Sequence, residues 1–202
     1  MTESAHGGLY FEIRELANTL DRLTARGMAG IFGVCGRALA PLLKQVERRS
    51  EGRWAVPDLA LALDSIEAFA TGLAEAANHD DLRARLMVAI SGEHPWSTYA
   101  QDVLICADAG LAAASVDSRP KPISIQYALE PLMAFMQNRD AGTIRIYGDN
   151  HWSKEIIKDP AMAKALGFLR SLIEEVSEAA LADSRQFDRL VSEAAVLRPV
   201  NR

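Results

Sequence analysis

The 202-residue sequence has few cysteines, no excess of basic residues and no long uninterrupted apolar run. Its two cysteines, Cys35 and Cys106, form no CxxC pair, which argues against a zinc knuckle and against a disulfide scaffold. Lysine and arginine number 22 against 27 aspartates and glutamates, and the net charge of -5 disfavours a general phosphate-backbone binder. We therefore expect no nucleic-acid partner, and a basic protein partner suits this charge better.

Signals for export and membrane insertion are missing too. The first residues, MTESAHGG, lack the basic and apolar regions of a signal peptide. Asp102 and Asp108 interrupt the longest apolar stretch, so no run of about 18 uncharged apolar residues exists to span a bilayer. We expect a cytoplasmic protein without a membrane partner. Hydrophobic residues at 49% and charged residues at 24% are typical of a globular chain, and we expect one domain over residues 1–202.

Motifs that carry common enzyme chemistry are absent from the sequence. It contains no GxxxxGK[ST] phosphate loop, no strand-linked GxGxxG and no GxSxG nucleophile elbow. Glycines recur every three residues over 27–36 inside a helical pattern, which favours close helix packing over phosphate binding. The histidines and acids at 79–81 and 93–94 lack the spacing that presents several metal ligands on one helical face. We expect no metal, no cofactor and no catalytic residue. These expectations favour a protein that is not an enzyme.

The remaining pattern is that of a series of helices. Apolar residues recur at three- and four-residue steps over 9–25, a helix that Gly27 is expected to end. Pro41 predicts a kink or a break in the following helix, and Asn78 is expected to cap a later one. Further helices are predicted over 28–48, 56–77, 79–91, 99–116, 124–137, 160–180 and 184–197.

One segment does not follow the helical pattern. Residues 143–147, TIRIY, alternate with period two before a turn at 148–150, which is typical of a strand. This segment either pairs with residues near Ile123 and Ile125 or forms an extended surface loop. The predicted fold class is therefore an all-α, multi-helix bundle around a buried central helix at about residues 99–116.

The central helix, Tyr99–Val116, carries a cysteine and two aspartates among small residues. A helix that is small or apolar on nearly every face belongs inside a helical body. Asp102 disfavours a thiolate at Cys106, and His94 lies about 18 Å away along a continuous helix, so we interpret Cys106 as a core residue. Asp102 and Asp108 lie about 120° apart around the helix axis. We expect them to pair with neighbouring helices; the alternative is a polar pocket with His94 in a small-molecule-binding protein or enzyme.

Aromatic residues and arginine, which are enriched at binding hot spots, gather in the segment 139–152. Either Tyr147 and Trp152 fold back to seal the core, or the segment contacts a protein partner. The candidate partner-binding residues are Arg145, Tyr147, Asp149, Asn150, His151 and Trp152.

An acidic run follows the middle of the 160–180 helix. It consists of Glu174, Glu175, Glu178 and Asp183. Such a run is either a solvated helix face or a surface for a basic partner.

Three helical blocks follow one another in this chain: FGVCGRALAPLLKQVERRS, YAQDVLICADAGLAAAS and IKDPAMAKALGFLRSLIEEV. Their order over roughly residues 30–180 resembles that of the YjaG-like all-helical bacterial proteins of unknown function, and more loosely that of all-helical immunity proteins of polymorphic-toxin systems. The chain departs from this pattern at Gly36-Arg37, where a glutamate usually precedes the arginine, and it lacks the histidine-rich central helix of some immunity proteins. The resemblance implies a compact helical fold, toxin neutralisation as one role and no catalytic residue. Together with the acidic charge, it leads us to expect a non-enzymatic immunity-type protein that binds a toxin directly, with a basic toxin domain as the candidate partner.

Overall fold

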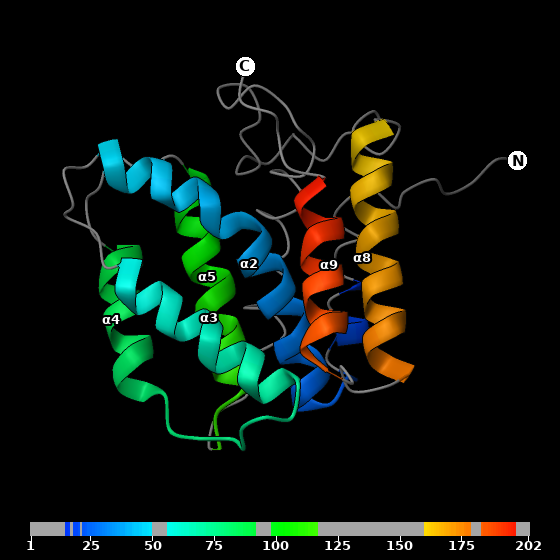
Figure 1. Ribbon diagram of the computed structural model, residues 1–202, viewed down its shortest axis with the longest axis horizontal. Helices are drawn as coiled ribbons and strands as arrows, with labels where there is room; N and C mark the ends of the chain where they lie inside the picture. The colour runs from blue at the N-terminus through cyan, green and yellow to red at the C-terminus, as the bar shows by residue number, and fades with distance from the viewer. Residues whose placement is uncertain are drawn as a thin grey trace, which may run out of the picture.

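The computed structural model describes residues 15–16, 18–20, 22–49, 56–91, 98–116, 160–178 and 183–196. Residues 15–16 and 18–20 are helical and precede α2. The helices that follow are α2 (Ala25–Arg49), α3 (Val56–Ala70), α4 (Asp80–Ser91), α5 (Thr98–Ala113), α8 (Pro160–Glu178) and α9 (Ser184–Val196). They pack together as an all-α bundle (Figure 1), which confirms the predicted fold class. The expected helix at 124–137 and strand at 143–147 lie outside the described residues.

The buried central helix is α5, as predicted. It packs against α2, α3 and α4, and the side chains described from Val103 to Ala114 are buried except for those of Ile105 and Asp108. Helix α2 shares the central position, because it contacts α3 and α5 on one side and α8 and α9 on the other (Figure 1). Among the helices described, none is both long and apolar enough to cross a membrane.

Glycines allow α2 to approach its neighbours closely. A Cβ on Gly33 would lie 3.0 Å from Ile66 of α3 and 3.1 Å from Phe187 of α9. A Cβ on Gly36 would lie 2.7 Å from Leu63 of α3. These separations are shorter than ordinary van der Waals contact, so the helix faces meet at this distance only because no side chain is present. The predicted packing role of the glycine repeat is confirmed at these positions.

The start of α2 corrects the expected end of the preceding helix. The Gly27 backbone N–H donates to Thr24 Oγ1 at 3.0 Å, so Thr24 is the N-cap and Gly27 lies inside α2. The preceding helix gives way to a turn instead, in which the Arg22 N–H donates to the Thr19 carbonyl at 3.1 Å. Pro41 does not break α2, which continues to Arg49. An exposed helix position tolerates the one backbone hydrogen bond that proline removes.

Helix α3 ends at Ala70, earlier than the expected end near Ala77. Gly72 adopts a positive φ of 77°, and its N–H donates to the Phe69 carbonyl at 3.1 Å. A glycine in this left-handed conformation is a common helix terminator, because it has no Cβ to clash. The sequence predicted a helix that continues beyond Ala70, but the left-handed backbone conformation of Gly72 ends α3 there.

The link from α3 to α4 is attached to the end of α5. Ala77 forms an isolated parallel β-bridge with Ser115, in which the Ala77 N–H donates to the Ala114 carbonyl at 3.2 Å. Asn78 then caps α4, because its Oδ1 accepts a hydrogen bond from the Asp80 N–H at 2.8 Å. The predicted cap is confirmed, whereas no sequence pattern predicted the bridge.

Candidate functional site

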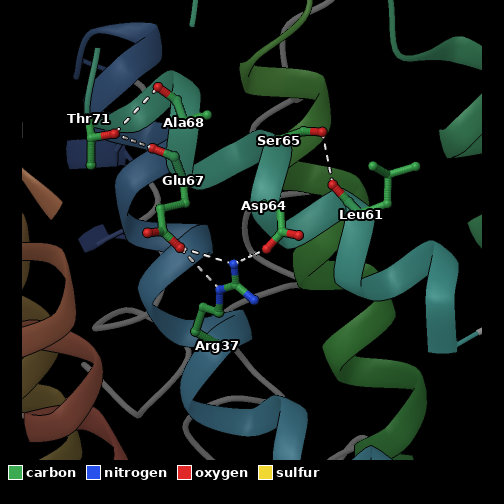
Figure 2. Close-up of polar contacts among 7 residues, drawn as sticks. All are labelled: Arg37, Leu61, Asp64, Ser65, Glu67, Ala68 and Thr71. Atoms are coloured by element: carbon green, nitrogen blue, oxygen red, sulfur yellow. Dashed lines mark hydrogen bonds and ion pairs between the residues drawn. The ribbon is translucent and has the colours of Figure 1, made fainter. Parts of the chain in front are cut away.

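Arg37 of α2 joins α2 to α3 through two carboxylates (Figure 2). Its Nε and Nη2 donate to Glu67 Oε2 at 3.3 Å and 3.0 Å, and Nη2 also donates to Asp64. Burial lowers the pKa of Arg37, but the hydrogen bonds and charges of Asp64 and Glu67 outweigh it and hold the pKa above its ordinary value. Arg37 therefore braces two helices with its positive charge held between two carboxylates.

Arg83 of α4 makes a second brace, to Asp108 of α5. Arg83 Nε donates to Asp108 Oδ1 at 2.8 Å, and Nη2 donates to Oδ2 at 3.3 Å. This confirms the expectation that Asp108 pairs with a neighbouring helix. In the alternative prediction Asp108 lines a pocket with Asp102 and His94, but the Asp102 side chain and His94 lie outside the described residues. The pocket therefore stays an untested alternative.

The two cysteines are core residues. Cys35 of α2 and Cys106 of α5 are each about 1% exposed, and they form no disulfide bond with each other. Burial raises the pKa of the Cys35 thiol far above its ordinary value, so the thiol keeps its proton. Within the described ranges, histidines, cysteines and acids form no group of three or more that could hold a metal ion.

A cleft of about 170 Å³ opens between Glu15, Leu16 and Thr19 on one side and α8 on the other. Its floor is apolar, because Leu16 and Ile173 are 5% and 4% exposed. Its rim is polar and exposed, and it carries two carboxylates and one guanidinium. The lining residues are Glu15, Leu16, Thr19, Arg170, Ile173 and Glu174. We call this feature the α8 cleft.

The acidic residues at 174–183 lie in two places: one lines the α8 cleft, and others contact α9. Glu175 accepts a hydrogen bond from Gln186 Nε2 at 3.1 Å, and Asp183 Oδ1 accepts one from the Gln186 N–H at 2.9 Å. Asp183 is therefore the N-cap of α9, a role that the spacing Asp183-x-x-Gln186 indicates in the sequence. Glu174 lines the α8 cleft, and the Glu178 side chain lies outside the described residues.

The candidate partner-binding segment stays a prediction. Its residues, Arg145, Tyr147, Asp149, Asn150, His151 and Trp152, all lie outside the described residues. The α8 cleft was missed by sequence reasoning. The sequence does show that Arg170, Ile173 and Glu174 share one helical face. It does not show that Glu15, Leu16 and Thr19 pack against that face, because this contact joins distant parts of the chain.

Comparisons of the chain with protein-family models, with curated proteins and with solved structures find no significant match. The function is therefore argued from the described residues and from the sequence.

Proposed function

We propose that the protein acts by binding another protein, as an immunity-type protein that neutralises a bacterial toxin by direct contact. The observation that carries this proposal is the α8 cleft, a small notch with an apolar floor and two carboxylates against one guanidinium at its rim. Small-molecule sites usually enclose about 300–1,000 Å³, so a notch of about 170 Å³ suits one protruding side chain better than a metabolite.

The charge of the chain supports a basic partner. The net charge is -5, and complementary charge raises the rate at which two proteins associate. The braces also support a binding role, because Arg37 and Arg83 are committed to carboxylates of adjacent helices. Helices joined in this way present a preformed surface, which lowers the entropic cost of association.

Co-expression with candidate toxins taken from the neighbouring genes tests the proposal. We expect the protein to restore growth and to co-elute with the toxin domain from a size-exclusion column. The proposal is overturned by a toxin that stays lethal and forms no complex, with the protein soluble and helical in the same cells.

A matched pair of variants makes this test specific to the cleft. Glu15→Gln/Glu174→Gln removes both rim carboxylates, and we expect it to weaken the toxin complex. Glu75→Gln/Glu193→Gln removes two exposed carboxylates that do not line the cleft, and we expect it to rescue growth as the unchanged protein does.

A further inference from the structure

We infer that an apolar patch across α3 and α4 is the docking surface for a helix of another protein, which is apolar along one face and basic at one end. This surface is distinct from the α8 cleft, and its occupant need not be a toxin, so the assignment goes beyond the proposed function. Three features of the patch support it: its exposure, the ion pair at its centre and the charge at one end.

The patch lies on two adjacent helices, α3 and α4 (Figure 1). Leu61 of α3 is 51% exposed, and Met87 and Val88 of α4 are 45% and 74% exposed. The exposed Ala84 lies one turn before Val88, on the side of α4 that faces away from the buried Leu86. We call Leu61, Ala84, Met87 and Val88 the α3–α4 patch. Apolar side chains that gather on a surface with a polar rim are typical of a protein interaction site.

An ion pair joins the two sides of the α3–α4 patch. Arg85 Nε of α4 donates to Asp58 Oδ1 of α3 at 2.9 Å, and Arg85 Nη1 donates to the Asp81 carbonyl at 3.4 Å. Asp58 lies one turn before Leu61, and Arg85 lies one turn before Val88, so the exposed apolar side chains flank this pair. The pair holds the patch in shape before binding, which lowers the entropic cost of association. It also compensates the charge of Arg85.

The free charge beside the α3–α4 patch is negative. Asp80 and Asp81 are exposed in the first turn of α4, and Asp81 precedes Ala84 by three residues on the same face. Within the ranges that the structure describes, the Asp81 carboxylate makes no hydrogen bond or ion pair. Asp80 accepts a hydrogen bond from the neutral Asn78 side chain at 3.2 Å, which leaves its charge in place. The positive end of the helix dipole, equivalent to about half a charge, offsets only part of these two charges.

This charge distinguishes a partner protein from a second copy of the chain. A second copy would bring the same acidic end, and its Arg85 is already paired with Asp58, so no free cation would meet Asp81. A partner helix with a lysine or arginine at one end supplies that cation. Its apolar residues can pack against the ridge that Ala84 and Val88 form on α4.

Methyl NMR of the full chain with helical peptides tests the assignment. The probes are a peptide of leucine and lysine with its leucines on one face, and a counterpart with glutamate at every lysine position. We expect the lysine peptide to shift the Leu61 and Val88 methyl signals saturably. The glutamate peptide should leave them in place, because the acidic end of the patch repels it. Asp81→Asn should raise the dissociation constant of the lysine peptide about two- to fivefold, as expected for an exposed ion pair.

A matched pair of variants tests the apolar contact, with the Leu61 methyl signals reporting the affinity in both. Met87→Ser/Val88→Ser should weaken binding of the lysine peptide at least about tenfold, because two apolar side chains are lost from the contact. The control is Leu73→Ser, which removes a 78% exposed leucine beyond the end of α3 and should bind within about twofold of the unchanged protein. Circular dichroism checks that each variant folds.

Equal binding of both peptides, no saturable shift of Leu61 or Val88, or an affinity that survives Met87→Ser/Val88→Ser overturns the assignment. So does a Val88 shift that grows with protein concentration alone, because a second copy of the chain then covers the patch. Binding of the lysine peptide by a protein that neutralises no toxin would leave the docking surface standing and reject the proposed function.

Discussion

Arg83 holds both carboxylate oxygens of Asp108, with Nε and Nη2 at 2.8 Å and 3.3 Å, and this contact joins α4 to α5. The side chains are only 26% and 21% exposed. Asp108 lies on the buried central helix, so its charge depends on this partner for compensation. The contact therefore gives Asp108 a structural role, which is to hold α4 against α5.

Asp108→Asn should destabilise the protein by about 1–3 kcal/mol, because the Arg83 guanidinium would lose its charged partner while remaining partly buried. Urea unfolding followed by circular dichroism measures this loss. Arg83→Met alone and Arg83→Met in the Asp108→Asn background complete the double-mutant cycle. Additive losses across the cycle would show that the pair does not couple α4 to α5.

Two glycine substitutions should change stability in opposite directions. A Cβ on Gly110 would lie 2.7 Å from Ile66 Cδ1 and 3.2 Å from Phe32 Cβ, and the Phe32 atom cannot swing away as the end of a side chain can. Gly110→Ala should therefore cost about 1–3 kcal/mol through overpacking. Gly167 of α8 has no atom within 4 Å of such a Cβ, so Gly167→Ala should stabilise the protein by about 0.5–1 kcal/mol.

Thermal unfolding measures both glycine variants, and the helical spectrum at low temperature checks that each one folds. Gly167→Ala is the control for Gly110→Ala, because the chemical change is identical and only the surroundings differ. A Gly110→Ala protein that unfolds at or above the temperature of the unchanged protein would contradict the close approach of α5 to α2 and α3.

His79 should make stability depend on pH. Burial lowers the pKa of His79 below its ordinary value of 6.5, the Arg83 charge lowers it further, and Asp80 opposes these effects. A histidine whose pKa is lower in the folded state binds more protons when unfolded, so acid favours unfolding. Its contribution is present above pH 6.5 and is lost as the pH falls below 6.5 towards the folded-state pKa.

The free energy of unfolding, measured between pH 7.5 and pH 5, should fall less steeply for His79→Gln than for the unchanged protein. His79→Gln keeps a polar side chain at the start of α4 and cannot gain a proton. Identical slopes for the two proteins would show that His79 titrates alike in the folded and unfolded chain.

Apolar periodicity predicted the all-α fold and the α8 and α9 helices well, because amphipathic spacing reports directly on burial. Helix ends followed local backbone chemistry instead. Thr24 and Asp183 are capping residue types in the appropriate places, and Gly72 ends α3 by its positive φ, so these signals were in the sequence.

Two further features depend on contacts between distant parts of the chain. The Ala77–Ser115 bridge and the α8 cleft form because separate elements pack together. Neither alanine at 77 nor glutamate at 15 carries a local signal of its partner. The pairing of Asp108 could be predicted only in part. A carboxylate on a buried helix needs a partner, but the sequence did not show that this partner is Arg83.

Cys35 should resist thiol reagents in the folded protein. Its side chain is 1% exposed, and burial raises the pKa of the thiol, so the reactive thiolate is scarce and shielded. Labelling with iodoacetamide in a Cys106→Ala background, followed by intact mass, should be slow in buffer and fast in urea. Raising the pH from 7 to 9 should accelerate the reaction in urea about tenfold or more, in line with a free thiol of pKa about 8.5, and change the native rate far less. Rapid labelling of the native protein at pH 8 would contradict the placement of Cys35 in the core between α2 and its neighbours.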